Sequence, residues 1–279
     1  MATSLQQRLL TAALLVPPLV LLVIFLPVIG FVVLTGIFVA LAAWEWAAMY
    51  RVHVFECSLF VVVVMLLGLV IFRYWPQLSP WLALLAVAGW LAGGVVIIAY
   101  EHGWPGWSSQ RWQMWLFGQL VLVPAWISLV AIRAGMPEGQ FWVLILFVLI
   151  WSADSAAFFA GRRWGRARLA ARVSPGKSRA GLYGAVCATL LFTIIIAFSV
   201  GYDFWPALYL VVLALLITLF SVVGDLVESL FKRNAGIKDS GHLLPGHGGF
   251  LDRIDSLTAA APVALAGLFV AGFWPGVVV

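Results

Sequence analysis

The sequence predicts an all-α fold, a polytopic integral membrane bundle of about nine transmembrane helices. Hydrophobic residues make up 64% of the 279 residues and charged residues only 10%, which excludes a soluble domain. Apolar stretches of about 17 to 25 residues recur along the chain, and each is long enough to cross a bilayer as a helix. The stretches are continuous rather than alternating, so a β-barrel is disfavoured. The expected spans are 10–28, 30–49, 57–73, 80–99, 113–132, 140–161, 182–200, 205–227 and 257–275.

The first two spans are the least clearly separated. Only Pro27 and Gly30 interrupt the apolar sequence between them, so a range of eight to ten spans stays open. The N-terminal stretch begins like a signal peptide, but Pro17, Pro18 and the lack of a small-residue cleavage site favour a retained helix. We expect a single membrane domain over 1–279, with N-terminal helices over about 1–110 and the functional helices and loops over about 111–279.

The basic residues predict the orientation in the membrane. With nine spans, Arg73 and Arg133 lie on one side and the other fourteen Lys and Arg lie on the opposite side. The positive-inside rule makes the richer side cytoplasmic, which puts the N-terminus inside and Val279 outside. The net charge of +5 therefore reflects membrane topology, and nucleic acid is not an expected partner. Both long polar segments, 162–181 and 232–256, fall on the cytoplasmic side, where a water-soluble substrate can reach them.

Acidic side chains lie near the cytoplasmic ends of three spans. They are Asp154 in the sixth span, Asp225 and Glu228 in the eighth, and Asp252 and Asp255 at the start of the ninth. A carboxylate in the hydrocarbon region is unfavourable, so such residues usually face a bundle interior, a partner or an ion. Carboxylates at two facing helix ends would form the oxygen-rich site that Mg²⁺ prefers. Internal salt bridges, for example between Asp225 and Arg253, are the alternative.

The segment from Ser229 to Asp255 concentrates charge in an otherwise apolar chain. It contains carboxylates, bases and a Pro-Gly-His-Gly-Gly turn. Glycines allow backbone N–H groups to approach a phosphate closely. Lysine and arginine side chains neutralise phosphate charge. The segment therefore predicts a site for a metal ion and a phosphorylated ligand, rather than a solvated loop whose cations only fix the topology.

This segment resembles the signature of the phosphatidate cytidylyltransferases (CDP-diacylglycerol synthases). The matching residues are Ser229, Phe231, Lys232, Arg233, Lys238, Asp239, Pro245, His247, Gly248, Gly249, Asp252, Arg253 and Asp255. The segment from Ser174 to Gly181 is similar to the Ser-Pro-x-Lys-Thr segment of that family, with Ser178 in place of Thr. The resemblance extends over the whole chain, including the N-terminal Leu-Gln-Gln-Arg and the nine-span layout.

The resemblance implies a nucleotidyl transfer. CTP and phosphatidate would give CDP-diacylglycerol and pyrophosphate, with Mg²⁺ as cofactor, in phospholipid biosynthesis at a bacterial plasma (inner) membrane. The expected catalytic residues are Asp225, Asp252, Lys232 and Arg253, and the expected metal ligands are Asp225, Glu228, Asp252 and Asp255. Substrate binding is expected of Ser174, Lys177, Ser178, Ser229, Arg233, Lys238, Asp239, His247, Gly248 and Gly249. Arg162, Arg163, Arg166 and Arg168 are expected mainly to keep their loop in the cytoplasm.

Two other functions stay open. A CTP-dependent transferase acting on another lipid phosphate, such as a polyprenyl phosphate, would need the same chemistry. An ion-coupled transporter also has buried acids, but these should lie at mid-span, whereas Asp225, Asp252 and Asp255 are expected at helix ends. A homodimer and a second cation in the site stay open as well. Glu45, with Arg51 close by, fits an interfacial acid as well as a functional one.

Overall fold

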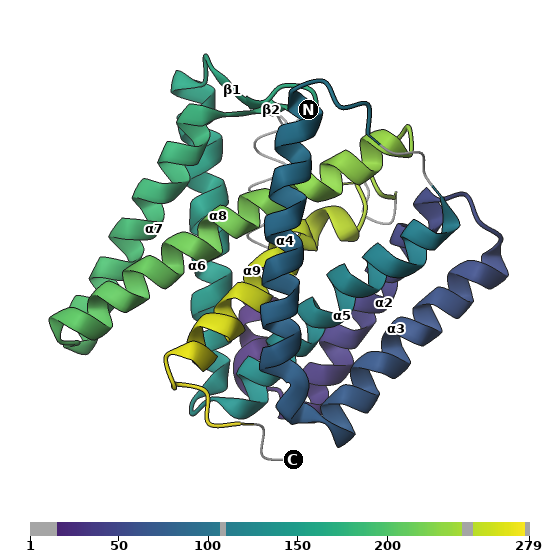
Figure 1. Cartoon of the computed structure of the whole chain (residues 1–279). Helices are drawn as coiled ribbons and strands as arrows, with labels where there is room; N and C mark the ends of the chain where they lie inside the picture. Colours follow the sequence, from purple (N-terminus) through teal and green to yellow (C-terminus); the bar gives the residue numbers. More distant parts are fainter. Residues whose placement is uncertain (1–15, 107–109, 242–247, 277–279) are drawn as a thin grey trace.

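The chain folds into a bundle of long helices (Figure 1). The structure is a computed structural model, and it describes residues 16–106, 110–241 and 248–276. A short apolar helix at Val16–Phe25 precedes eight long ones. These are α2 (Val28–Met49), α3 (Val54–Tyr74), α4 (Ser79–Glu101), α5 (Arg111–Gly135), α6 (Gly139–Trp164), α7 (Arg179–Val200), α8 (Phe204–Asn234) and α9 (Leu251–Val270). All eight are long and apolar enough to cross a membrane, so the predicted all-α, multi-pass membrane fold is confirmed.

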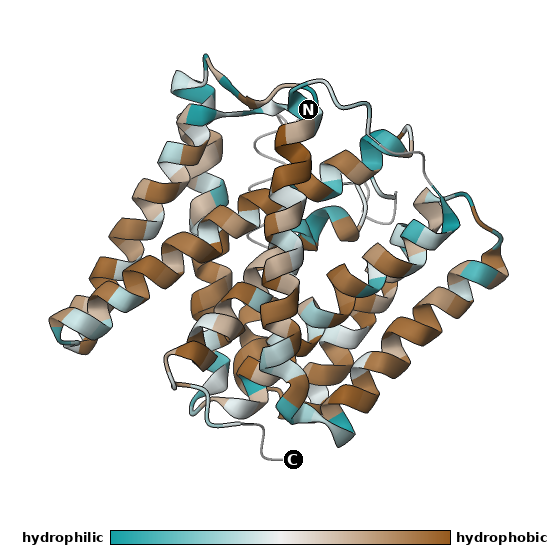
Figure 2. Ribbon diagram, in the orientation of Figure 1, coloured by the Kyte–Doolittle hydropathy of each residue, from teal (hydrophilic) through white to brown (hydrophobic). Residues whose placement is uncertain are grey.

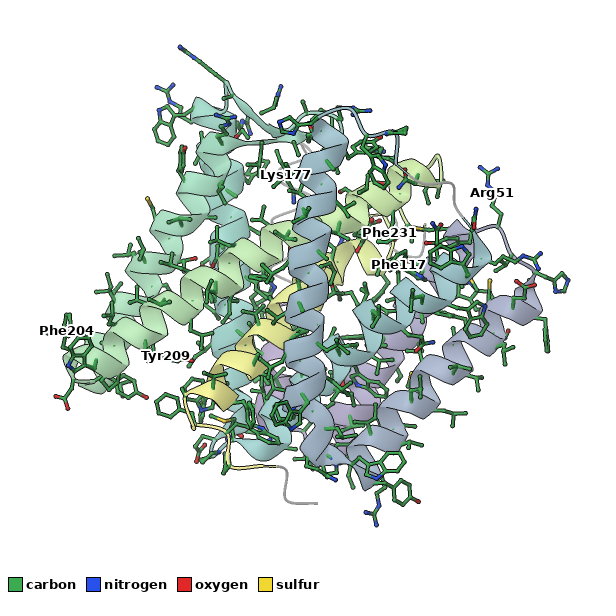
Figure 3. All side chains as sticks on the ribbon, viewed as in Figure 1. Arg51, Phe117, Lys177, Phe204, Tyr209 and Phe231 are labelled. Atoms are coloured by element: carbon green, nitrogen blue, oxygen red, sulfur yellow. The ribbon has the colours of Figure 1, made fainter. Side chains whose placement is uncertain are left out.

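The described residues also include two short elements that the sequence did not predict. A 3-10 helix, η1 (Pro76–Leu78), leads into α4. An antiparallel hairpin of β1 (Arg168–Ala170) and β2 (Ser174–Ser178) connects α6 to α7. Its register places Arg168 opposite Ser178. The basic segment after the sixth predicted span is therefore an ordered hairpin, and its Lys177 lies in the upper part of the bundle (Figure 3).

The largest boundary errors of the prediction lie at the two helices richest in acids. The α8 helix continues to Asn234 instead of ending at 227, and α9 runs from Leu251 to Val270 instead of from 257 to 275. Hydropathy locates the apolar part of a helix, but the backbone stays helical wherever its polar side chains find partners. One such partnership is the pair of Glu228 and Lys232, spaced one helical turn apart in the added segment of α8.

The helices alternate in direction, so their connections collect at two ends of the bundle. The connections after α2, α4, α6 and α8 lie at one end, here named the hairpin end because β1 and β2 lie there (Figure 1). Hydrophilic residues gather at this end, while the helix flanks are apolar (Figure 2). Arg51 and Lys177 lie at the hairpin end, and Phe204 lies toward the other (Figure 3). Arg73 and Arg133, in the last turns of α3 and α5, also lie toward that other end, as the sequence predicts.

The best-buried helices of the bundle are α5 and α9. In the most apolar 18-residue stretch of each helix, buried residues make up 67% in α5 and 61% in α9. Trp126 of α5 is 2% exposed and donates a hydrogen bond from Nε1 to Thr35 Oγ1 of α2 at 3.0 Å. Its ring lies against Gly68 of α3, where a side chain would overlap it. These contacts pack α2, α3 and α5 into one group of helices.

The crossing of α8 and α9 positions the acidic residues. At Gly224 a Cβ atom would lie 2.8 Å from the Asp255 carbonyl oxygen and 2.9 Å from Ala259 Cβ. The missing side chain therefore lets the two helices approach closely at this point. Asp225 follows Gly224 directly, so the close crossing brings the carboxylate-bearing parts of α8 and α9 together. Because α8 extends to Asn234, Asp225 lies about two and a half turns inside the helix rather than at its end.

Candidate functional site

A cavity of about 550 Å³ lies at the hairpin end of the bundle. Its walls come from α6, the hairpin, α7, α8 and the start of α9. The charged and hydroxyl-bearing residues on its lining are Asp154, Arg162, Arg168, Lys177, Ser178, Asp225 and Ser256. Phe158, Leu182 and Val222 add an apolar part to the wall. Cations, carboxylates and apolar surface in one cavity suit a ligand that carries both phosphate groups and an apolar portion.

An ion pair between Lys177 and Asp225 spans this cavity. Lys177 Nζ of β2 lies 2.6 Å from Asp225 Oδ2 of α8, and the two side chains are 24% and 29% exposed. Ser229 donates a hydrogen bond from Oγ to Asp225 Oδ1 at 3.3 Å. Three predicted site residues therefore meet, although they come from segments about fifty residues apart. Internal salt bridging, the alternative that the sequence left open, therefore occurs at Asp225, with Lys177 as its partner. Arg253 is exposed on α9.

Other carboxylates lie within electrostatic range of Asp225. Asp154 of α6 interacts with Asp225 and Lys177. Asp255 of α9 interacts with Asp225, Glu228 and Lys177. In the described part of the chain, however, no three acidic, histidine or cysteine side chains are close enough to form a ready-made metal cluster. The positive charge beside Asp225 comes from Lys177 in this structure.

Lys232 lies in a buried network about two turns farther along α8 than Asp225. Its Nζ donates to Glu228 Oε1 at 3.0 Å and to Asp252 Oδ1 at 2.5 Å, and its side chain is only 8% exposed. Removing one member of such a buried group leaves an uncompensated charge, so the three side chains stabilise the crossing of α8 and α9 together. Lys232 is absent from the cavity lining. Lys232, which the sequence predicted to be catalytic, therefore joins α8 to α9 in this structure.

Asp252, a predicted metal ligand, closes the polar segment onto α9. Its Oδ2 accepts hydrogen bonds from the backbone N–H groups of Ser240 at 3.0 Å and Gly249 at 2.8 Å. Gly248 has a φ of +77°, a left-handed conformation that favours glycine. Together with Lys232 at Oδ1, these donors use both carboxylate oxygens of Asp252. Gly248 and Gly249, predicted to contact substrate, shape this turn.

The hairpin that carries Lys177 is fastened from two sides. Glu101, the last residue of α4, accepts hydrogen bonds from the backbone N–H groups of Arg172 and Val173, both at 2.9 Å. Arg233 of α8 donates from Nε to the Val173 carbonyl at 3.4 Å and from Nη1 to the Ile237 carbonyl at 3.1 Å. Arg233, predicted to bind substrate, therefore joins the hairpin to the segment that follows α8. Lys177 is held at a fixed place as a result.

The remaining predicted residues lie at different places. Ser178 lines the cavity and caps α7, since its Oγ accepts a hydrogen bond from the Gly181 N–H at 3.1 Å. Ser174 is half-buried at the start of β2, and Lys238 and Asp239 are exposed after α8. His247 lies outside the described residues, so its role in substrate binding stays a prediction.

Two arginines that the sequence did not predict to bind substrate lie on the cavity lining. They are Arg162 and Arg168, for which mainly a topological role was expected. Arg163 and Arg166 are exposed and are not part of the lining. The pairing of Arg168 with Ser178 in the hairpin explains its position beside Lys177. A hairpin of so few residues leaves no clear alternation in the sequence, so this proximity could not be read from the chain.

Known proteins resemble this chain over most of its length. The model of the Cytidylyltransferase family matches residues 6–271. The chain belongs to this family. It is 40% identical to a phosphatidate cytidylyltransferase of Pseudomonas aeruginosa over 96% of this chain and 98% of the relative. It is 35% identical to one of Haemophilus influenzae over 92% of this chain and 96% of the relative, and 39% identical to one of Brucella suis over 68% and 67%. The recognition of the cytidylyltransferase family from the signature segment is confirmed.

Proposed function

We propose that this membrane protein transfers a cytidylyl group from CTP to phosphatidate. A phosphate oxygen of phosphatidate would attack the α-phosphorus of CTP, and the bond from that phosphorus to the β-phosphate bridging oxygen would break. The products are CDP-diacylglycerol, with a new P–O–P linkage, and pyrophosphate. The observation that carries the proposal is the cavity in which Lys177 and Asp225 meet, in a chain that matches the cytidylyltransferase family over most of its length.

Three cations on the cavity lining are suited to bind the phosphates. Lys177, Arg162 and Arg168 offer charge-assisted hydrogen bonds to the triphosphate of CTP and to the lipid phosphate. Nucleotidyl transfer needs the two phosphates aligned and their charge neutralised, and it needs little covalent help from the protein. The hairpin contacts of Glu101 and Arg233 support this alignment, because they fix the backbone that carries Lys177.

The carboxylates around Asp225 fit a hard cation such as Mg²⁺. Asp154 and Asp225 line the cavity, and Asp255 lies in electrostatic range of Asp225. Carboxylate oxygens that face a cavity open to phosphates are the ligand set that Mg²⁺ takes in enzymes acting on nucleotides. When bound, the metal ion would neutralise phosphate charge. Glu228 and Asp252 would join the ligands only if they exchanged their bonds with Lys232.

The position of the cavity suits one soluble and one lipid substrate. The hairpin end carries the basic connections, so the positive-inside rule makes it cytoplasmic, and CTP would enter from the cytoplasm. Phe158, 40% exposed on α6, gives the same cavity an apolar border toward the outside of the bundle. In a bacterium the membrane concerned would be the plasma (inner) membrane. The helices from 111 onward would carry the chemistry, while α2 and α4 support it in a single membrane domain.

A comparison of lipid acceptors tests the proposal. Protein purified in detergent receives CTP, Mg²⁺ and either phosphatidate or a polyprenyl phosphate, and pyrophosphate release is measured. We expect release with phosphatidate and not with the polyprenyl phosphate. Release only with the polyprenyl phosphate would establish the other lipid-directed reaction. No release with either lipid, in protein that keeps its helical content, would contradict a transferase function.

A further inference from the structure

We infer that Glu45 is a positioning residue that closes the signature segment of the active site from the N-terminal half of the chain. Glu45 lies on α2 and is 2% exposed. Its Oε2 accepts a hydrogen bond from Ser240 Oγ at 2.9 Å and another from the Leu251 N–H at 2.8 Å. Ser240 lies in the connection between α8 and α9, and Leu251 is the first residue of α9. One carboxylate therefore joins a point in that connection to the start of α9.

Glu45 of α2 and Asp252 of α9 both accept hydrogen bonds from the connection between α8 and α9. Asp252 Oδ2 accepts from the backbone N–H groups of Ser240 and Gly249, while Glu45 Oε2 accepts from the Ser240 hydroxyl and the Leu251 N–H. Ser240 thus bridges the two carboxylates through its N–H and its hydroxyl. A chain of contacts continues from Asp252 to Lys232. The hydrogen bonds of Glu45 and Asp252 together fix the first turn of α9, which carries Asp252.

The surrounding glycines show that the Glu45 carboxylate occupies a fitted place. A Cβ atom at Gly241 would lie 2.7 Å from Glu45 Cδ. A Cβ atom at Gly249 would overlap both Glu45 Oε2 and Ser240 Oγ. Neither glycine has a positive φ, so close approach to the carboxylate, rather than backbone conformation, is what requires glycine at both positions.

The end of α2 is rigid enough to serve as an anchor. Trp46, next to Glu45, is 1% exposed and donates from Nε1 to the Met114 carbonyl of α5 at 3.2 Å. Its ring also packs edge-on against Phe231 of α8, with 4.9 Å between the ring centroids. Since α2 is fastened to α5 and α8 beside Glu45, the carboxylate offers its acceptor at a fixed position. The two hydrogen bonds at Oε2 offset part of the cost of burying this carboxylate, while Oε1 is buried with no hydrogen-bond partner among the described residues.

The functional consequence rests on the proposed function. The close crossing at Gly224 brings α9 to the cavity wall, and Asp255 lies one turn after the residues that Glu45 and Asp252 fix. A loosened first turn of α9 would misplace Asp255 relative to Asp225 and slow the chemical step. Glu45 does not line the cavity, so it acts through the segment and not on the substrate.

Amide hydrogen exchange of the detergent-solubilised full chain tests the closure without an activity assay. Glu45→Ala removes the acceptor, and exchange at Ser240, Gly249 and Leu251 should rise about tenfold to a hundredfold, the usual effect of losing a hydrogen bond to a charged group. Exchange in α3 should stay unchanged. Glu45→Gln keeps an acceptor oxygen and should restore most of the protection. Glu56→Ala, which removes an exposed ion pair with Arg111, is the matched control and should change neither region.

Kinetics then separate positioning from general stability. Glu45→Ala should lower kcat about tenfold or more, with a smaller change in KM for CTP, and Ser240→Ala should add little to it because both changes break the same contact. A rise in exchange throughout the chain, unchanged exchange at the segment, or a local rise with unchanged kcat would overturn the inference. If Glu45→Ala does not fold, Ser240→Ala is measured instead, and a rise in amide exchange confined to the segment again supports the inference. A wild-type chain without transferase activity would contradict the proposed function. The exchange measurement would still test whether Glu45 fixes Ser240 and Leu251.

Discussion

The ammonium group of Lys177 lies 2.6 Å from the carboxylate of Asp225 and so joins the β1–β2 hairpin to α8. Each group is the kind that the proposed reaction needs, a cation for phosphate and a carboxylate for Mg²⁺. The two groups neutralise each other across the cavity. We expect substrate and metal ion to separate them, with Lys177 turning to phosphate and Asp225 to the metal ion.

Replacing Asp225 by Asn should remove most of the activity. The substitution keeps the shape of the side chain but removes the charge that would hold Mg²⁺ and pair with Lys177. Turnover should fall by about a hundredfold or more, the combined effect of losing more than one charge-assisted contact. The measurement is kcat over a range of Mg²⁺ concentrations. Near-normal activity at limiting Mg²⁺ would contradict the assignment of Asp225 as a metal ligand.

The cations of the hairpin region should differ according to whether they line the cavity. Lys177→Gln and Arg168→Gln should each lower kcat/KM about tenfold to a hundredfold, because each removes a charge-assisted bond to phosphate. Arg166→Gln is the control, since Arg166 is exposed and outside the lining. It should leave kcat/KM almost unchanged. Equal effects of all three substitutions would mean that the cavity does not select the substrate-binding cations.

Lys232 should prove to be a stabilising residue more than a substrate ligand. Lys232→Met leaves Glu228 and Asp252 buried without their cation, which typically destabilises a fold by about 3 to 5 kcal/mol. Thermal unfolding in detergent should show a clear drop in Tm. The double variant with Glu228→Gln should recover part of it, because one uncompensated charge is gone. An unchanged Tm combined with a loss of activity would instead indicate that Lys232 binds phosphate.

Cysteine labelling tests the orientation in the membrane. Cys57 and Cys187 are first replaced by Ala, and single cysteines are then introduced at the exposed positions 168, 203 and 238. A membrane-impermeant thiol reagent added to intact cells should reach position 203, after α7, and should not reach 168 or 238 at the hairpin end. Disrupted cells provide the control for reactivity at all three positions. Labelling of 168 from outside would place the cavity on the wrong side for cytoplasmic CTP.

Much of the fold could be predicted because a membrane makes hydropathy decisive. Eight of the nine predicted spans are long apolar helices, whereas the first, 10–28, begins outside the described residues and is helical over Val16–Phe25. Arg73 and Arg133 lie toward the same end of the bundle, which followed from counting spans. Asp225 and Lys177 could be proposed for the site because a carboxylate in an apolar span and a cation in a Pro-Gly turn are chemically unusual.

The partners of these residues could not be predicted, since they depend on contacts between distant segments. Glu228 and Lys232 are neighbours on one helical face, but the third member of their network, Asp252, joins only through the crossing of α8 and α9 at Gly224. Glu45 likewise meets its partner Ser240 across 195 residues of sequence. No local sequence pattern indicates such a contact. The acidic residues could therefore be identified from the sequence, but their hydrogen-bond and ion-pair partners could not.

The most direct test of the account follows the fate of each phosphate of CTP. Purified protein receives phosphatidate, Mg²⁺ and CTP labelled in either its α-phosphate or its γ-phosphate, with Asp225→Asn as the matched control. The account predicts that the α-label moves into the lipid extract as CDP-diacylglycerol while the γ-label appears only in pyrophosphate. Asp225→Asn should lower the amounts of both labelled products about a hundredfold or more. Transfer of the γ-label to lipid, or no α-label in the lipid extract, would contradict cytidylyl transfer by this protein.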